Sequence, residues 1–372
     1  MDEKDKLADD FVHLARIALT GRAQDVQLML HRSARRYRTA HPGLSELLSK
    51  LLQEAPTRSS PLRRQAETAL PVDVDSRMHL LRVEQFPALD HAIVLDEVSE
   101  RKLAQLVAER LRPDELRKAG LEPTKTGLFT GPPGVGKTMA ARWVALQLGR
   151  PLLILDLAAV MSSFLGRTGS NVRYVLDYAK STECVLLLDE LDAIAKRRDD
   201  RGEIGELKRL VTVLIQEIDD WPSSGVLLAA TNHPELLDPA IWRRFEMVVE
   251  FPLPNRAALE RFINTALDGR VTRLDVWSKA LALNLRGHSF SDVERGLTQA
   301  RRSAAVHGRP IEESLGTMLR NESLSKVDRI ELASTLVEGG IMSQRQAHEA
   351  TGVARDTIRS RGKRTAVAEV DS

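Results

Sequence analysis

One octapeptide constrains the fold of this chain more than any other feature. Residues 131–138 read Gly-Pro-Pro-Gly-Val-Gly-Lys-Thr and match the pattern G-x-x-x-x-G-K-[ST]. Leu128-Phe129 before them is typical of a strand, and residues 139–148 after them have the spacing of a helix. Glycines there let the backbone wrap around phosphate groups with its N–H groups turned inward. The motif therefore predicts a phosphate-binding loop within an α/β fold.

The side chains of this loop and of a second motif suit phosphate and magnesium chemistry. Lys137 supplies a point charge for β- and γ-phosphates, and Thr138 supplies a hydroxyl for Mg²⁺. The second motif, residues 185–190, is a run of four apolar residues followed by Asp189 and Glu190. It predicts a buried strand that delivers Asp189 to the Mg²⁺ shell and Glu190 to polarise an attacking water.

A third apolar run, residues 226–230, ends in Thr231-Asn232. An amide there can orient the attacking water beside Glu190, although taken alone the asparagine is better explained as a cap for the next turn. Asp192 is expected to cap or pair locally at the start of the following helix, and not to act as a third catalytic carboxylate.

Short apolar runs alternate with helical stretches from about residue 90 onward, and two more of strand length lie at 152–155 and 247–251. This alternation predicts a parallel sheet flanked by helices. Purely helical spacing covers the regions on either side. We expect a helical N-terminal domain, the α/β part, a helical part and a C-terminal segment, at residues 1–70, 71–253, 254–308 and 326–372.

From about residue 90 to 308 the chain resembles the AAA ATPases. Residues 131–138 resemble the Walker A loop, residues 186–190 resemble Walker B, and Asn232 resembles sensor 1. Residues 237–245, Leu-Asp-Pro-Ala-Ile-Trp-Arg-Arg-Phe, resemble the second region of homology with its paired arginines. The resemblance implies an AAA+ parallel sheet followed by an α-helical lid, with ATP and Mg²⁺ as cofactors and ATP hydrolysis as the reaction.

The resemblance also implies roles for individual residues. Glu190, Asn232, Arg243 and Arg244 are the implied catalytic residues. The two arginines would reach the γ-phosphate of a neighbouring subunit, where a guanidinium fork suits the charge. An arginine supplied by a neighbour implies a ring, and hexamers are the norm in this family. The residues implied to contact the nucleotide are Val94, Leu95, Pro133, Gly134, Val135, Gly136, Lys137, Thr138 and Met139, with Thr138 and Asp189 on Mg²⁺.

Two further segments resemble AAA elements. Residues 287–293 resemble the start of the sensor 2 helix, but Phe290 and Ser291 replace the usual Gly-Ala, which leaves the nucleotide contacts of this segment open. Residues 164–166, Phe164-Leu165-Gly166, resemble pore loop 1, which faces the axial channel. The resemblance implies that they grip an extended polypeptide, whereas the alternative is that Phe164 packs as core.

The C-terminal segment resembles a helix-turn-helix. Ser343 is placed to cap one helix, Gly352 to make the turn, and Val353 and Ile358 to hold the second helix inward. Six Lys/Arg residues stand against two acids over 343–364. That charge suits a phosphate backbone, and equally the basic face of a small protein-docking module. The candidate DNA-binding residues are Arg345, Arg355, Arg359 and Arg361.

Composition and charge limit the alternatives. The net charge is only +2 over 372 residues, so any nucleic-acid surface must be local. The single cysteine, Cys184, excludes an internal disulfide framework and fits a reducing compartment. The N-terminus is acidic without an apolar segment behind it, and no apolar run approaches the roughly 18 residues that span a bilayer. We therefore expect a cytoplasmic protein with no membrane partner.

Two functions compete at this point. The first is a homohexameric ring that unfolds, remodels or threads protein substrates. The sequence holds neither His-Glu-x-x-His nor Gly-x-Ser-x-Gly, so a proteolytic partner would be another chain. The chain also resembles bacterial AAA proteins found beside subtilisin-like serine proteases in mobile-element and phage-defence modules. The second function is a DNA-associated AAA regulator or loader that uses the C-terminal helix-turn-helix.

Overall fold

The computed structural model describes residues 81–89, 91–163, 168–196, 204–319 and 324–368, with short stretches between 29 and 48. The chain divides into two units, Met1–Ala69 and Leu70–Ser372. In the first unit the described residues 43–48 are helical, and the Ser45 hydroxyl donates a hydrogen bond to the Ala34 carbonyl at 2.7 Å. The rest of the predicted N-terminal helical domain lies outside the described residues.

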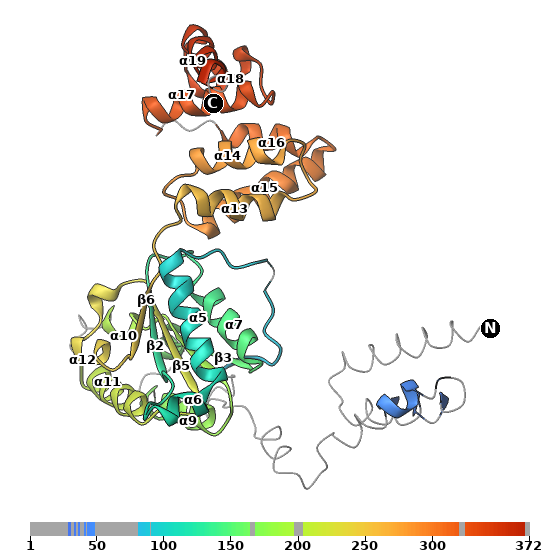
Figure 1. Cartoon of the computed structure of the whole chain (residues 1–372). Coiled ribbons are helices and arrows are strands. Elements are labelled where there is room, and N and C mark those ends of the chain that lie inside the picture. Colours follow the sequence, from blue (N-terminus) through green and yellow to red (C-terminus); the bar gives the residue numbers. More distant parts are fainter. Residues whose placement is uncertain are drawn as a thin grey trace. The chain divides into compact units, whose positions relative to one another are not determined.

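A mixed sheet of six strands forms the centre of the α/β part (Figure 1). Its order is β1-β3-β4-β5-β2-β6, and every neighbouring pair is parallel except β1 with β3. The strands are β1 (Arg82–Glu84), β2 (Thr126–Thr130), β3 (Leu152–Asp156), β4 (Val185–Asp189), β5 (Val226–Thr231) and β6 (Met247–Glu250). The parallel sheet predicted from the five apolar runs is confirmed.

Strand β1 is the part of the sheet that the sequence did not predict. Its three residues, Arg-Val-Glu, carry no apolar run, and only Val83 packs on the core. The strand forms because the free edge of β3 offers backbone partners, with Arg82 opposite Ile154. Pairing of that kind depends on tertiary context, so the residues of the strand alone do not predict it.

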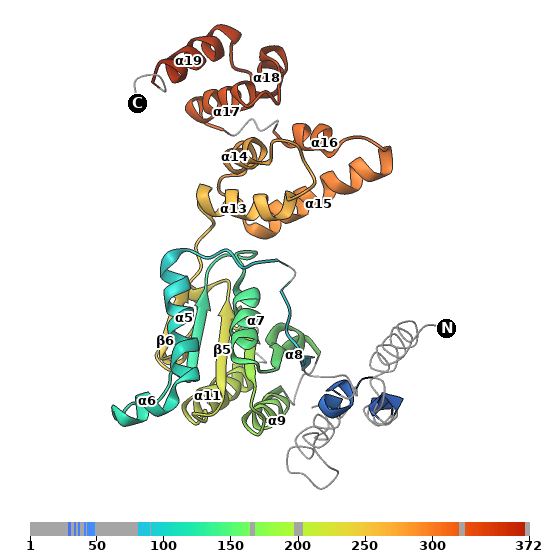
Figure 2. The same cartoon turned by 45° about the vertical axis from the view of Figure 1, so that its right-hand side comes forward.

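Helices cover both faces of the sheet (Figure 2). The helical segments of the α/β part are α5 (Glu97–Leu111), α6 (Pro113–Lys118), α7 (Lys137–Leu148), α8 (Leu157–Ser163), α9 (Thr168–Lys180), α10 (Ala193–Lys196), α11 (Ile204–Asp219), η2 (Pro234–Leu236) and α12 (Pro239–Trp242). Strands β3, β4 and β5 are apolar except at their last residue, because helices cover the sheet on both sides. The strand residues alternate between the two resulting cores.

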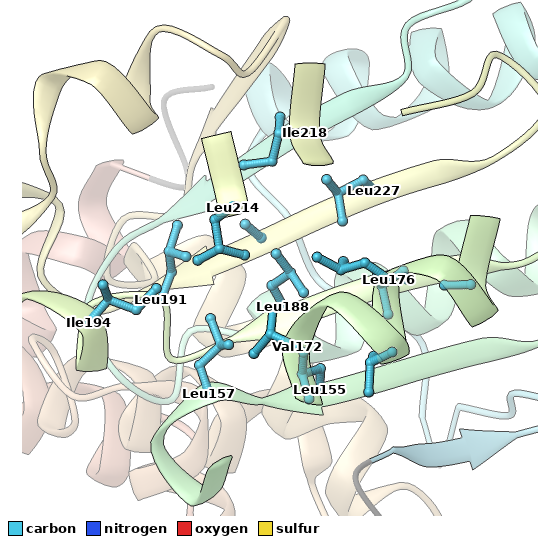
Figure 3. Close-up of a cluster of buried hydrophobic side chains, with 14 of the residues drawn as sticks. Leu155, Leu157, Val172, Leu176, Leu188, Leu191, Ile194, Leu214, Ile218 and Leu227 are labelled. Atoms are coloured by element: carbon cyan, nitrogen blue, oxygen red, sulfur yellow. The ribbon is translucent and has the colours of Figure 1, made fainter. Parts of the chain in front are cut away.

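One core lies between the sheet and helices α8, α9 and α11, where Leu155, Leu188 and Leu227 meet Val172, Leu176 and Leu214 (Figure 3). The other lies between the sheet and helices α5 and α7, where Leu187 and Leu228 meet Leu103 and Val144. Burial of apolar area contributes about 25 cal/mol per Å², so both layers stabilise the α/β part. Cys184 belongs to the first core, as its apolar run suggested.

In the C-terminal part, all the regular elements that the structure describes are helices. It comprises α13 (Arg256–Leu267), α14 (Leu274–Asn284), α15 (Phe290–His307), α16 (Ile311–Met318), α17 (Lys326–Glu338), α18 (Gln344–Thr351) and α19 (Arg355–Ala368). Helix α16 was not predicted, because its eight residues follow Pro310 in a stretch that reads as a linker. Its Leu315 is completely buried among α13 to α17, so the apolar cluster of the lid continues past residue 308.

Helix α17 faces two clusters at once. Leu332 and Leu336 are buried with the lid helices, while Ala333 packs with Ala347, Val353 and Ile358 in a smaller cluster with α18 and α19. The C-terminal segment therefore shares a helix with the lid. Among the described residues, no helix is both long enough and apolar enough to cross a membrane.

Candidate nucleotide-binding site

The sheet topology brings the three sequence motifs to one edge. Strand β5 lies between β2 and β4, and all three run parallel. The Gly131–Thr138 loop follows β2, Asp189 ends β4, and Asn232 follows β5. Carboxyl ends of parallel strands meet at the same edge of a sheet, which is where ligands of open α/β folds bind.

The loop has the backbone that its glycines predict. Gly131 has a φ of 141° and Gly136 a φ of 99°, values that side-chain-bearing residues rarely adopt. A Cβ atom at Gly131 would also collide with the Phe251 carbonyl. Gly136 caps α7 without a side-chain hydrogen bond, whereas Ser289 and Asn255 cap α15 and α13 with theirs. The first N–H groups of α7 therefore have no side-chain acceptor and suit an anion.

Lys137 is buried beneath this loop. Its Nζ donates hydrogen bonds to the carbonyls of Gly131 at 2.7 Å and Pro132 at 2.9 Å, and to Asn232 Oδ1 at 2.7 Å. Burial lowers the pKa of its ammonium group to about 8, while the nearby charges of Asp189 and Asp192 act in the opposite direction. The sequence-predicted lysine and asparagine are thus in direct contact, although 95 residues separate them.

Thr138 and Asp189 meet at the end of β4. The Thr138 hydroxyl donates to Asp189 Oδ2 at 3.1 Å, and the Glu190 N–H donates to Asp189 Oδ1 at 3.0 Å. A hydroxyl and a carboxylate are hard oxygen donors, and Mg²⁺ in phosphate sites is held by one or two such ligands together with substrate phosphates. The two residues therefore fit the ion that the sequence predicted for them.

Glu190 has an unusual backbone. Its φ is 54°, in the left-handed region, where a side-chain-bearing residue costs of order 1–3 kcal/mol. The following Leu191 is completely buried, and its N–H donates to the Ala230 carbonyl of β5. This pairing carries the chain across the sheet edge and leaves the Glu190 side chain exposed beside the cavity.

Asp192 corrects an expectation. It was expected to cap or pair locally, but its buried Oδ1 accepts hydrogen bonds from the Thr231 hydroxyl at 2.9 Å and the Asn232 N–H at 3.2 Å. Asp192 therefore fixes the end of β5, next to the asparagine of the site. Sequence spacing could not reveal this contact, because the partners lie 39 and 40 residues away.

A cavity of about 320 Å³ opens above the loop, within the size range of small-molecule sites. It is lined by all seven predicted loop residues from Pro133 to Met139, and by Val94, Asp189, Glu190 and Asn232. Leu95 does not line it, because its side chain is buried in the core beneath α5. Its other lining residues are His91, Ile93, Phe262, Phe290, Ser291 and Glu294, of which His91, Phe262 and Glu294 were not predicted from the sequence.

The lid touches the loop directly. The Ser291 N–H donates to the Gly134 carbonyl at 3.1 Å. A Cβ atom at Gly134 would lie 2.6 Å from Ser289 Oγ, so only glycine fits there. The segment whose nucleotide contacts the sequence left open therefore closes one side of the cavity. In the sequence, the feature that drew attention to this segment was the replacement of the usual Gly-Ala by Phe290 and Ser291.

Arg243 and Arg244 lie away from this cavity, among neither its lining residues nor its hydrogen bonds. Both are exposed. Arg244 Nη1 forms an ion pair with Asp219 Oδ2 at 3.2 Å, and its backbone carbonyl accepts from the Thr126 hydroxyl. A surface position is where a residue that serves a neighbouring subunit would lie.

Phe164, Leu165 and Gly166 lie outside the described residues, between α8 and α9. The helix-turn-helix expectations fall on described residues. Ser343 and Gln346 form a capping box on α18, Gly352 ends that helix with a φ of 70°, and Val353 and Ile358 are buried. The four arginines proposed for DNA contact are exposed, and Arg345 pairs with Glu349 at 3.0 Å.

Comparison with known proteins agrees with this geometry. The family model described as "ATPase family associated with various cellular activities (AAA)" matches residues 127–253. An uncharacterized AAA family ATPase of Sinorhizobium fredii, y4kL, is 36% identical over 292 residues, which cover 78% of this chain and 88% of that protein. The chain belongs to the AAA ATPase family. The chain is accordingly an ATPase that hydrolyses ATP.

Other AAA relatives match a shorter part of their own length. The ATP-dependent zinc metalloprotease FtsH of Acidothermus cellulolyticus is 35% identical over 216 residues, 56% of this chain and 32% of that protein. The proteasome-activating nucleotidase of Methanothermobacter thermautotrophicus is 31% identical over 241 residues, 62% of this chain and 58% of that protein. The chain thus spans about a third and about three fifths of these two relatives.

Proposed function

We propose that this AAA ATPase assembles into a homohexameric ring that uses ATP hydrolysis to unfold, remodel or thread protein substrates. The observation that carries the proposal is the cavity where Lys137, Asp189, Glu190 and Asn232 converge beneath a helical lid. Support comes from relatives whose names describe ATP-dependent proteolysis and proteasome activation. A separate serine protease is the partner that we propose for this chain within a defence module, because the chain resembles bacterial AAA proteins found beside such proteases. It would be another chain, since this sequence holds neither His-Glu-x-x-His nor Gly-x-Ser-x-Gly.

The residues of the cavity divide the hydrolytic step among them. The loop N–H groups and Lys137 bind the phosphates, and Lys137 exchanges its three protein oxygens for phosphate oxygens. Thr138 and Asp189 hold Mg²⁺, which supplies charge neutralisation on the β- and γ-phosphates when bound. Glu190 accepts a proton from the attacking water, and Asn232 orients that water. Arg243 and Arg244 of a neighbouring subunit stabilise the charge of the transferring phosphoryl group.

The substrate grip that we propose is Phe164-Leu165-Gly166. The helices that flank it, α8 and α9, pack on the first core of the sheet. Glu217 of α11 adds ion pairs to α9, with Arg173 at 3.2 Å and Lys180 at 2.7 Å. These contacts give the two ends of the loop a fixed base, as a segment that pulls on a polypeptide requires. Phe164→Ala should keep basal ATP hydrolysis and lose substrate unfolding.

The decisive experiment is affinity capture with tagged Glu190→Gln protein held in ATP. This variant should bind ATP and hydrolyse it at least 100-fold more slowly, which traps bound clients. Mass spectrometry of the captured material should identify protein clients, with Lys137→Ala protein as the matched control that cannot be loaded. Capture of the same proteins by both variants would contradict ATP-dependent remodelling.

A second candidate function is a DNA-associated AAA regulator or loader. The favouring observation is α19, on which Arg355, Thr357, Arg359 and Ser360 are all exposed, and among its residues of described burial, 355–361, only Ile358 is buried. A helix with so little packing and so much basic charge suits a DNA groove. Sequencing of nucleic acid from the same capture tests it. Enriched DNA without protein clients would support this candidate against the first.

A further inference from the structure

A groove lies between helix α16 of the lid and helix α18 of the C-terminal segment. It has a volume of about 430 Å³, and it shares no lining residue with the nucleotide cavity. Residues of α16 line one side and residues of α18 line the other, while Trp277 of α14 and the turn between α17 and α18 contribute the remaining lining. ATP hydrolysis therefore makes no use of this groove.

The apolar part of the groove is anchored to α17. Ile341 and Met342 follow the end of this helix, and their N–H groups both donate to the Leu336 carbonyl, at 3.0 and 3.1 Å. The Leu336 side chain is completely buried among the lid helices. Ile341 and Met342 are only half-buried, so part of their apolar surface stays open. The groove is thus preformed, and an occupant would not have to order these residues first.

Gly316 keeps the α16 side of the groove open. A Cβ atom there would lie 3.6 Å from Met342 Cε, which is ordinary van der Waals contact, so packing does not demand glycine at this position. Gly316 stands inside an eight-residue helix, where glycine is less favourable than alanine. The space that it leaves is therefore space for an occupant, and a larger side chain there would fill it.

Carboxylates stand on both sides of the apolar residues. Glu312 and Glu313 belong to α16 and Glu349 to α18, and none of the described residues that line the groove is Lys or Arg. From outside the groove, Arg345 pairs with Glu349 at 3.0 Å and Arg309 with Glu313 at 3.8 Å. Exposed pairs of this kind are weak, so the carboxylates can exchange them for cations of an occupant. The same charges disfavour the phosphates of a nucleic acid.

We propose that the groove between α16 and α18 is a docking site for a basic amphipathic helix of another protein. An apolar centre with carboxylates on both sides is complementary to a helix whose apolar face is flanked by Lys or Arg. The basic helix of this chain, α19, does not fit, because the only aliphatic residue between 355 and 361, Ile358, is buried in its own cluster. A helix bound in the groove would contact the lid and the C-terminal segment together.

The test uses the full chain and a labelled peptide of about 18 residues, or five helical turns, made of Leu, Lys and Ala with its leucines on one face. Fluorescence anisotropy without added nucleotide measures its binding, so failure of the proposed ATP-driven function would leave the result unaffected. The same peptide with Glu in place of Lys should bind at least about tenfold more weakly, because its charges repel the rim. Equal binding of the two peptides would overturn the proposal.

Two variants locate the bound peptide. Gly316→Leu should weaken binding of the basic peptide at least about tenfold by filling the groove, and Glu349→Lys should weaken it about fivefold by reversing one rim charge. Glu338→Lys is the matched control, because Glu338 is exposed on α17, does not line the groove and brings the same change in net charge. Its affinity should stay within about twofold of wild type.

Two results with these variants would overturn the proposal. One is wild-type affinity in Gly316→Leu, and the other is an equal effect of Glu349→Lys and Glu338→Lys. The second comparison decides alone if Gly316→Leu does not fold, since both of its substitutions are at exposed positions. Tighter binding of a peptide with the sequence of residues 355–368 would assign the groove to a second copy of this chain, and would also overturn a foreign partner.

Discussion

Lys137 carries the buried positive charge of the cavity, and three oxygen acceptors surround its ammonium group. Their carbonyl and amide dipoles satisfy the donors without neutralising the charge, so burial still lowers the pKa to about 8. A polyphosphate would present negatively charged oxygens to the N–H donors of the same ammonium group. The protonated lysine is therefore favoured once phosphate binds, and binding is linked to proton uptake above pH 8.

The first prediction follows from this linkage. ATP affinity should be nearly constant from pH 6.5 to 7.5 and should fall about tenfold between pH 7 and pH 9, because free Lys137 loses its proton through a pKa of about 8 while the bound lysine keeps it. Calorimetric titrations at constant ionic strength measure this. Lys137→Met should bind weakly at every pH with a flat profile, and a flat wild-type profile would contradict the linkage.

Cys184 supports a second prediction at the same scale. Its thiol is buried in the first core and donates to the Ala179 carbonyl at 3.4 Å, and burial raises its pKa to about 12. A thiol that stays protonated and covered is a poor nucleophile. Native protein should therefore resist alkylation at pH 8 for as long as it remains folded, and should react at once in denaturant. Rapid native labelling, followed by mass spectrometry, would show that this core opens.

At the scale of elements, α17 decides how the C-terminal segment relates to the lid. Leu332 and Leu336 are completely buried among the lid helices, and Arg256 of α13 pairs with Glu331 at 2.5 Å. Arg273, just before α14, donates to the Gly339 carbonyl at the end of α17. The residues on the other face of α17 hold α18 and α19. Movement of the lid therefore carries α17 with it.

The third prediction tests this shared helix. Leu332→Ala should destabilise the lid by about 2–5 kcal/mol, because it removes methylene contacts from a fully packed site and leaves a cavity. Val327→Ala is the control, since Val327 lies on the same helix but is 66% exposed, and it should change stability by less than about 0.5 kcal/mol. Hydrogen exchange of α13 and α14 reports the effect. Equal exchange in both variants would mean that α17 is separable from the lid.

At the scale of the whole molecule, the two arginines before Phe245 differ in environment. Arg244 forms an ion pair with Asp219 at 3.2 Å, whereas the neighbouring Arg243 is exposed and none of the ion pairs found among the described residues involves it. An exposed ion pair of this kind is worth at most about 1 kcal/mol, so Arg244 can exchange Asp219 for a phosphate of a neighbouring subunit. The ring that we propose needs that exchange at every interface.

The fourth prediction concerns this interface. Arg243→Ala and Arg244→Ala should each lower turnover at least 100-fold while ATP affinity stays within about twofold, because the loop and Lys137 that bind ATP are untouched. Mixing either variant with wild-type subunits should inhibit the wild type beyond simple dilution. Asp219→Asn is the matched control that removes the ion pair and keeps both arginines. Strictly additive activity on mixing would argue against action between subunits.

The sequence by itself determined the chemistry of the loop and the type of fold. The glycines at 131, 134 and 136, Lys137 and Thr138 carry a local geometry that only a phosphate loop uses, and the apolar runs before Asp189 and Asn232 predict buried parallel strands. These features can be recognised in the sequence because each depends only on residues a few positions apart. The capping box at Ser343 and the turn at Gly352 were predictable for the same reason.

Only the tertiary structure decided which distant residues share the cavity. Lys137 contacts Asn232 across 95 residues, and Asp192 accepts a hydrogen bond from Thr231 of β5. The rings of His91, Phe262 and Phe290 also pack together, although they come from three separate segments. The spacing of such segments in the sequence carries no information about their distance in space. Helix α16 and the double role of α17 likewise depend on which faces find a partner. Local preferences select helix or strand, but burial against a partner decides position.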